Sequence, residues 1–389
     1  MPTINRFADL HDDITAWRRD IHENPELQFD VFRTAGVVEE KLKEFGVDSI
    51  ETGVGRTGVV GVIKGKSNNS GKVIGLRADM DALPMQEMTG LDHASKTPDK
   101  MHACGHDGHT AMLLGAAQYL AETRNFDGTV VVIFQPAEEG GGGGREMVDD
   151  GMMDKYDIQE VYGMHNMPGF DVGQFAIRPG PLMAAADLIE IKVTGKGGHA
   201  AMPHKSVDPT VASAQIVTAL QSIVARNLDP LESLVVSVTS FHTDVDTYNV
   251  IPDTVQMKGT VRSYLIEVQD MAEARITAIA ENIATAMGCQ AEVTYIRNYP
   301  ATVNSHDHTT MAADVAAGIV GDDKVIRDTP PVMGAEDFSF MLNARPGAFI
   351  FVGNGDTAPV HNPEYDFNDE IIPIGCSYWA KLVETRLSA

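Results

Sequence analysis

The sequence predicts an α/β protein with two domains, a larger one built on a mainly parallel sheet and a smaller one inserted into it. Two observations support this prediction. Short, continuous apolar runs alternate with stretches of helical periodicity, which is typical of parallel strands covered by helices. After Pro179-Gly180-Pro181 the pattern changes to strands of alternating polarity, and the first pattern returns after about Asn298.

The larger domain begins with helical spacing over residues 14–45, broken at 23–25, which predicts two helices joined by a proline turn. His22 falls at this break, and as a single histidine it is expected to cap a helix or pack at the surface. A further helix is predicted over Thr110–Thr123. The predicted strands are 58–63, 72–77, 129–134, 160–164 and 347–352.

The inserted domain has the predicted order β-α-β-β-α-β, the ferredoxin-like split unit, which folds as two layers. Its predicted strands are 187–194, 233–241, 254–264 and 290–297, and its predicted helices are 207–226 and 268–287. The predicted boundaries are therefore 1–183 and 298–389 for the larger domain and 184–297 for the inserted one.

Composition excludes several classes of partner. The net charge is -25 and the pI about 4.8, which opposes binding to nucleic acid or anionic lipid. No apolar run is long enough to span a bilayer, and the N-terminus lacks a signal pattern. The three cysteines, Cys104, Cys289 and Cys376, are far apart and odd in number, so a reducing, cytoplasmic location is expected.

Polar clusters follow several of the predicted strands. In a parallel sheet such positions lie at one edge, where ligands bind. The densest cluster is Met101–Thr110, which holds His102, Cys104, His106, Asp107 and His109. It is either a polar loop that caps the next helix or half of a metal site. The density of thiol and imidazole groups favours the metal site, with Cys104 and His106 among the candidate ligands.

Glu138 and Glu139 form a second constellation after an apolar strand. Adjacent side chains diverge, so one carboxylate can bind metal while its neighbour faces a water molecule. A solvated acidic loop is the alternative. The tract Gly140–Gly144 allows close backbone approach, but it lacks the Gly-Lys-Ser/Thr ending of a phosphate-binding loop.

His165 and His361, each beyond an apolar strand, complete a possible ligand set. Either histidine alone would be read as an ordinary loop residue. Together with Cys104, His106 and Glu139 they exceed what one tetrahedral ion requires, so two ions sharing a ligand are plausible. Asp79 could bind metal or a ligand imidazole, and Asp81 is expected to hold a ligand imidazole rather than to cap a helix.

Three polar residues stand out in the inserted domain. His199 lies in a glycine-rich loop that either presents it to a neighbouring site or forms a flexible turn. Asn249 and Arg262 lie among strand-forming residues. The planar guanidinium of Arg262 suits a substrate carboxylate, although a simple surface position explains the spacing equally well.

The chain resembles the amidohydrolase branch of the aminoacylase and carboxypeptidase-type zinc metallopeptidases, the branch of hippurate hydrolase, indole-acetyl-amino-acid hydrolase and N-acetyldiaminopimelate deacetylase. The resemblance covers nearly the whole length. It rests on these ordered motifs: 18–27, 77–84, 101–110, 135–140, 164–166, 197–200, 334–338 and 361–363.

The resemblance implies a zinc-peptidase-like catalytic domain with an inserted lid that forms a homodimer. It implies a two-metal centre of Zn²⁺, or of Mn²⁺, Co²⁺ or Ni²⁺, with Glu138 as general base. His199 would reach the partner subunit's site and stabilise the oxyanion, and Asn249 and Arg262 would contact the substrate near its carboxylate. The implied ligands are Cys104, His106, Glu139, His165 and His361.

The sequence departs from the wider family at two places, with Asp79-Met80-Asp81 instead of His-x-Asp and with Cys104 instead of a bridging aspartate. Both departures are features of the amidohydrolase branch. The implied reaction is hydrolysis of N-acyl-amino acids, with hippurate-like acyl groups favoured over N-acetyl groups. A dipeptidase or carboxypeptidase of the same family, and a metal-binding module without catalysis, are the alternatives.

Overall fold

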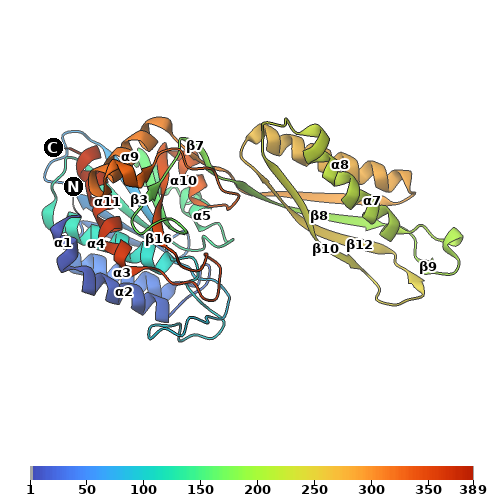
Figure 1. Cartoon of the computed structure of the whole chain (residues 1–389), viewed down its shortest axis with the longest axis horizontal. Coiled ribbons are helices and arrows are strands. Elements are labelled where there is room, and N and C mark those ends of the chain that lie inside the picture. The colour runs from blue at the N-terminus through green and yellow to red at the C-terminus, as the bar shows by residue number, and fades with distance from the viewer. Residues whose placement is uncertain (1–2, 389) are drawn as a thin grey trace. The chain divides into compact units, whose positions relative to one another are not determined.

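A computed structural model describes residues 3–388 of the chain (Figure 1). These residues form two compact units. The large unit comprises the chain up to Leu182, Thr302–Pro330, and the chain from Asp337 onward. The small unit comprises Met183–Ala301 and the short segment Pro331–Glu336. This last segment was not predicted to leave the larger domain, because nothing in its local pattern distinguishes it.

The large unit is built on an eight-stranded sheet of order β1-β2-β4-β3-β5-β16-β6-β15. The strands are β1 (Ser49–Val54), β2 (Gly58–Lys64), β3 (Val73–Asp79), β4 (Thr129–Gln135), β5 (Glu160–Pro168), β6 (Phe175–Ala176), β15 (Val325–Ile326) and β16 (Gly347–Gly355). The central strands β4, β3, β5 and β16 are parallel, which confirms the predicted sheet.

The β1–β2 edge is the antiparallel part of this mainly parallel sheet. β2 runs antiparallel to β4 and forms a hairpin with β1. An antiparallel pair needs only a short turn between its strands, whereas a parallel pair needs a crossover. β1 was not predicted, because its residues are mostly exposed or half-buried and lack an apolar run.

Helices cover both faces of the large sheet (Figure 1). α4 (His106–Thr123) and α11 (Ile372–Arg386) pack together on one face, and α5 (Gly143–Asp149) and α10 (Phe338–Ala344) lie on the other. Val130, Val132 and Phe134 of β4 belong to the core cluster that contains α4 and α11. The remaining helices are α1 (Asn5–Asp9), α2 (His11–Glu23), α3 (Phe32–Phe45), α6 (Met152–Lys155) and α9 (His306–Val320).

The start of α4 was predicted wrongly at Thr110. The helix begins at His106, after Gly105 with a left-handed φ of 85°. The side chain of Asn166 fills the space that a Cβ on Gly105 would occupy, so the turn requires glycine. The polar residues of the first turn resemble a loop, yet they are buried. They face a polar interior that local sequence does not reveal.

The small unit contains a four-stranded antiparallel sheet of order β10-β12-β8-β13, with α7 (Pro209–Ser222) and α8 (Ile266–Ala286) packed on one face. The chain order is the predicted β-α-β-β-α-β. The strands are β8 (Ala185–Thr194), β10 (Leu234–Thr243), β12 (Thr254–Ser263) and β13 (Gln290–Tyr299). A separate short pair joins β9 (Gly198–His199) to β11 (Val250–Ile251). Among the described residues, no helix has the length and apolar character that crossing a bilayer requires.

Candidate metal centre

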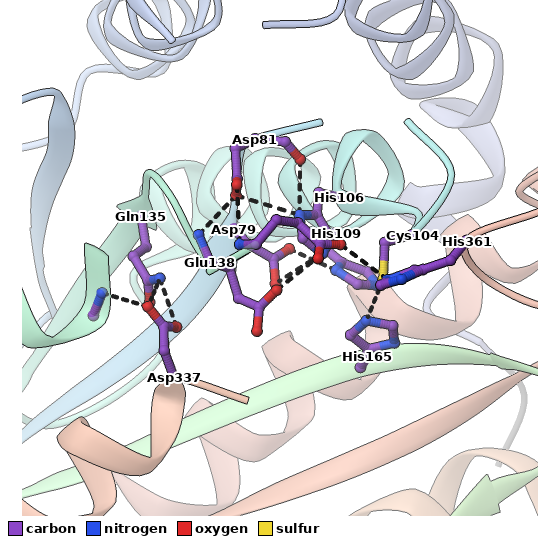
Figure 2. A network of polar contacts seen from close by, with 12 residues as sticks. Asp79, Asp81, Cys104, His106, His109, Gln135, Glu138, His165, Asp337 and His361 are labelled. Carbon is purple, nitrogen blue, oxygen red and sulfur yellow. Dashed lines mark hydrogen bonds and ion pairs between the residues drawn. The ribbon is translucent and has the colours of Figure 1, made fainter. Parts of the chain in front are cut away.

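The candidate site lies at the carboxyl edge of the parallel strands. Asp79 ends β3, Glu138 and Glu139 follow β4, His165 lies in the last part of β5, and His361 follows β16. Cys104 and His106 approach the same edge from the start of α4. The parallel register places these strand ends side by side, so side chains distant in sequence meet (Figure 2).

The five predicted ligands form two groups that share Cys104. Cys104, His106 and His165 make one group, and Cys104, Glu139 and His361 make the other. Within each group the possible ligand atoms lie within 4.8 Å of one another. The Sγ atom of Cys104 is 3.3 Å from His165 Nε2, and His361 Nε2 is 3.1 Å from Glu139 Oε1. The arrangement suits two cations bridged by a thiolate.

Hydrogen bonds from the protein orient the two buried imidazoles. The Nδ1 atom of His106 is 2.8 Å from the backbone carbonyl of Asp81, and His165 Nδ1 is 2.5 Å from that of Asn166. A carbonyl only accepts, so each Nδ1 carries a proton, which leaves Nε2 as the ring nitrogen that can bind an ion. Among the described residues, His106 Nε2 is buried without a hydrogen-bond partner, as expected of a ligand atom.

Asp81 contacts the His106 imidazole, as its predicted role requires, and it also has a second set of partners. Its backbone carbonyl lies 2.8 Å from His106 Nδ1, and its carboxylate Oδ1 lies 3.5 Å from the same atom. The carboxylate accepts two consecutive backbone N–H groups, from Glu138 at 2.9 Å and Glu139 at 3.1 Å. Asp81 therefore holds the loop that carries both glutamates, just beyond Ala137, whose φ is 54°.

Asp79 and His109 form a supporting pair that sequence reasoning left open. Asp79 accepts hydrogen bonds from Arg77 Nη1 at 2.7 Å and from His109 Nδ1 at 2.6 Å. His109 Nε2 accepts the backbone N–H of Asn166 at 2.9 Å, so neither of its ring nitrogens is available to an ion. Burial opposes the charge on Asp79, but nearby His106 and Arg77 hold the pKa of its carboxyl well below the usual range.

Electrostatics at the site favours cations. Burial raises the pKa of the Cys104 thiol well above its usual value, and the charges of Glu139 and Glu138 raise it further. Burial alone would lower the pKa of His106, but Asp79 and Asp81 outweigh it and raise that pKa to about 10. Positive charge placed here would stabilise the thiolate and balance the carboxylates. The donor set of thiolate, imidazole and carboxylate fits borderline-soft divalent ions.

The loop of the two glutamates is also held by a buried network around Asp337, which sequence reasoning missed. Asp337 accepts hydrogen bonds from Arg77 at 2.9 Å, from Gln135 at 2.8 Å and from the backbone N–H of Gly144 at 2.7 Å (Figure 2). The glycine tract therefore offers its N–H group to a carboxylate of the protein itself. The motif at 334–338 was the available signal, but the local pattern assigned it no role.

The three candidates of the small unit are held by few contacts. His199 is exposed in β9, where its Nδ1 accepts the N–H of Ala201 at 3.1 Å. Asn249 is exposed. Burial lowers the pKa of Arg262, against the smaller opposing effect of the Asp187 carboxylate. The side chain is half-buried on the sheet face opposite the helices, and its Nη1 donates to Thr260 and to the carbonyl of Val261. Its guanidinium therefore keeps donors for an anion.

Two groups of possible metal ligands beside an additional carboxylate, at the carboxyl edge of an α/β sheet, are typical of one class of protein, the hydrolases that activate water with two metal ions. The chain belongs to peptidase family M20/M25/M40, whose sequence model matches residues 75–385. This membership agrees with the resemblance drawn from the motifs.

Relatives of known name match almost the whole chain. Hippurate hydrolase from Campylobacter jejuni is 43% identical over 382 residues, which cover 98% of each chain. N-acetylcysteine deacetylase from Bacillus subtilis is 39% identical over 374 residues, 96% of each chain. Among solved structures, a dinuclear metal-binding peptidase of family M20 from Bacillus subtilis is similar with a TM-score of 0.84 and 34% identity, covering 98% of this chain and 99% of that one.

Proposed function

We propose that this protein is a metal-dependent amidohydrolase that splits N-acyl-amino acids into a carboxylic acid and a free amino acid. The observation that carries the proposal is the position of Glu138. Its carboxylate lies 4.0 Å from His106 Nε2, beside the two ligand groups but belonging to neither of those that share Cys104. A carboxylate at this position can exchange protons with a water molecule held between the ligand groups.

The ligand groups support two divalent ions, and zinc is our proposed metal because a thiolate is shared between them. When bound, such ions polarise the amide carbonyl and lower the pKa of water. Side chains of the protein carry out the proton transfers and hold the reacting groups in place. Glu138 accepts a proton from the attacking water and passes it to the departing amine. Asp81 keeps Glu138 in place through its backbone N–H.

The small unit supplies the remaining proposed roles. His199 donates a hydrogen bond to the developing oxyanion, and Asn249 and Arg262 bind the substrate near its carboxylate. Arg262 supports this role because both of its described hydrogen bonds are made by Nη1, which leaves the other N–H groups of the guanidinium for an anion. On a protein with a net charge of -25, an anionic substrate needs such a local cation.

We further propose a homodimer formed through the small unit, with each His199 serving the partner's site. Exposed apolar side chains support the proposal. Most of the large apolar residues that are exposed in the described part of the chain belong to the small unit. Of these residues, only Phe32, Met88 and Val303 lie outside it. Those within it include Leu231, Phe241 and Tyr248. Apolar side chains that one chain leaves exposed can be covered by the small unit of a second copy.

The proposed substrates are hippurate-like acyl-amino acids first and N-acetyl-amino acids second. The test is dialysis against a chelator, followed by hydrolysis assays on a panel of both kinds before and after Zn²⁺ is restored. We expect activity on hippurate or an N-acetyl-amino acid that is lost with the metal and returns with it. Absence of metal-restorable hydrolysis on the whole panel would instead identify a binding module without catalysis.

A peptidase is the second candidate, because the similar Bacillus subtilis structure is that of a peptidase of family M20. Free dipeptides in the same panel distinguish the two. Faster hydrolysis of dipeptides than of every acyl-amino acid would overturn our choice.

We also propose a reducing compartment, the cytoplasm. Cys104, Cys289 and Cys376 are all free and buried, and Cys104 must stay reduced to bind metal.

A further inference from the structure

Two basic residues of α2, Arg18 and His22, are completely buried. They belong to the motif at 18–27, whose role the metal centre does not explain, and His22 was predicted to cap a helix or pack at the surface. That prediction was wrong, because α2 turns both side chains into the protein beneath the first turn of α4. Burying a cation destabilises the folded state unless a negatively charged partner compensates it. The partners of Arg18 and His22 therefore indicate the role of these two residues.

His22 lies between two carboxylates from different segments. Its Nδ1 is 2.8 Å from Asp107 Oδ2, and its Nε2 is 3.3 Å from Glu87 Oε2. Asp107 directly follows the proposed ligand His106 in the first turn of α4. Glu87 lies in the loop that precedes Met101–Thr110 and also accepts the backbone N–H of Ser95 at 2.7 Å.

Arg18 extends the same network to the end of the chain. Its Nε donates to Asp369 Oδ1 at 2.8 Å, and its Nη1 donates to Asp107 Oδ2 at 3.4 Å. Its Nη2 lies 3.2 Å from His93 Nε2, in the same loop as Glu87. Asp369 ends the segment that begins after β16 and carries the proposed ligand His361.

Two of these partners, Asp107 and Asp369, lie in the segments that carry the proposed ligands, and Glu87 and His93 lie in the loop that precedes the first of them. Met101–Thr110 provides Cys104 and His106, and 356–369 provides His361. Backbone hydrogen bonds join the segments directly, from His361 N to the carbonyl of Ala103 at 2.7 Å and from Met88 N to that of Pro363 at 2.8 Å. His361 has a left-handed φ of 63°, a strained conformation that its surroundings must maintain.

We propose that Arg18 and His22 are positioning residues that hold the segments of Cys104, His106 and His361 at the separation that metal binding requires. Neither side chain belongs to a ligand group, so the effect passes through Asp107, Glu87 and Asp369. Apolar packing could hold α2 in place equally well. Charged hydrogen bonds also fix the direction in which each partner side chain approaches, and therefore the relative positions of the segments that carry them. The inference rests on the proposed metal centre.

The test measures Zn²⁺ affinity by competition with a chromophoric chelator, together with the thermal midpoint of the metal-free protein. His22→Gln keeps a polar side chain but cannot bridge both carboxylates. We expect the folded variant to bind Zn²⁺ about 10- to 100-fold more weakly, the range seen when groups that orient metal ligands are lost. Glu87→Gln, which preserves shape, should weaken binding in the same direction and serves if His22→Gln does not fold.

His308→Gln is the matched control. His308 is mostly buried and its Nε2 is 3.3 Å from Glu160 Oε2, at the end of β5 remote from His165. This variant should lower the thermal midpoint while leaving Zn²⁺ affinity within about twofold, since it disturbs no ligand segment. Equal losses of affinity in His22→Gln and His308→Gln would show a general effect of destabilisation and overturn the inference.

A spectroscopic readout separates the inference from the proposed function. Co²⁺ in place of zinc reports ligand geometry through its visible absorption, so His22→Gln should alter that spectrum and His308→Gln should not. Wild-type protein that binds neither metal would overturn the metal centre, and the inference with it. Wild-type binding that His22→Gln and Glu87→Gln leave unchanged would overturn the inference alone.

Discussion

The large and small units hold their candidate functional residues in opposite ways. In the large unit, Cys104, His106 and His165 are buried, and hydrogen bonds to backbone carbonyls fix both imidazoles. In the small unit, His199 and Asn249 are exposed, with few contacts. His361, with an exposed imidazole, is the exception in the large unit. Groups that bind ions need rigid placement, whereas groups that meet a substrate need access.

This difference predicts that substitutions in the two units will have distinguishable effects on turnover, metal content and thermal stability. The largest expected effect is that of Glu138→Gln, which removes the proton acceptor while keeping its size. We expect kcat to fall by about 10²- to 10⁴-fold with metal content unchanged. Metal analysis alongside the kinetics checks both halves of this prediction. Full turnover in a metal-loaded Glu138→Gln protein would remove Glu138 from the reaction.

His199→Ala in the small unit should have the next largest effect. Loss of one donor to an oxyanion typically lowers kcat by about 10²- to 10³-fold, and the exposed position of His199 predicts no change in the thermal midpoint. Mixed dimers of His199→Ala and Glu138→Gln should regain part of the activity, because one site then has both intact residues. If mixing restores nothing, His199 does not act across subunits.

The smallest expected effect is a stability difference that depends on pH. Burial opposes the charge on Glu160, but hydrogen bonds from His308, Arg386 and Tyr162 outweigh it and lower the pKa of Glu160 to about 2 from 4.5. A depressed carboxyl pKa contributes stability that is fully present above about pH 4.5 and is lost as the pH falls through about 2. Glu160→Gln should therefore lower the thermal midpoint near neutral pH, and its difference from wild type should shrink on acidification.

Glu190→Gln is the control for this prediction in the small unit. Glu190 forms an exposed pair with Lys258 at 3.2 Å, and such pairs contribute about 0–1 kcal/mol. Its thermal midpoint should stay close to that of wild type at every pH. A larger shift for Glu190→Gln than for Glu160→Gln would contradict the contrast between buried and exposed pairs.

The sequence predicted the sheet centre and the assembly of five possible ligands, because each of these residues follows an apolar strand or opens a helix at the same edge. It did not predict what holds them. Asp369 is 351 residues from Arg18, and Asp337 is 260 residues from Arg77, so no local pattern connects them. The bonds from the Asp81 carboxylate to the loop of Glu138 and Glu139 also escaped prediction, because they are made to backbone N–H groups, which nearly every residue carries.

Because the small unit is inserted into the large one, part of the large unit is synthesised only after the small unit. Four of the proposed ligands are made before the small unit, but His361 follows it, as does α11, which packs against α4. The backbone N–H of Ile4 donates to Ser377 Oγ at 3.0 Å, so the first and last helical segments meet. During synthesis the chain therefore carries a thiol and two imidazoles of the proposed centre before His361 and α11 have been made.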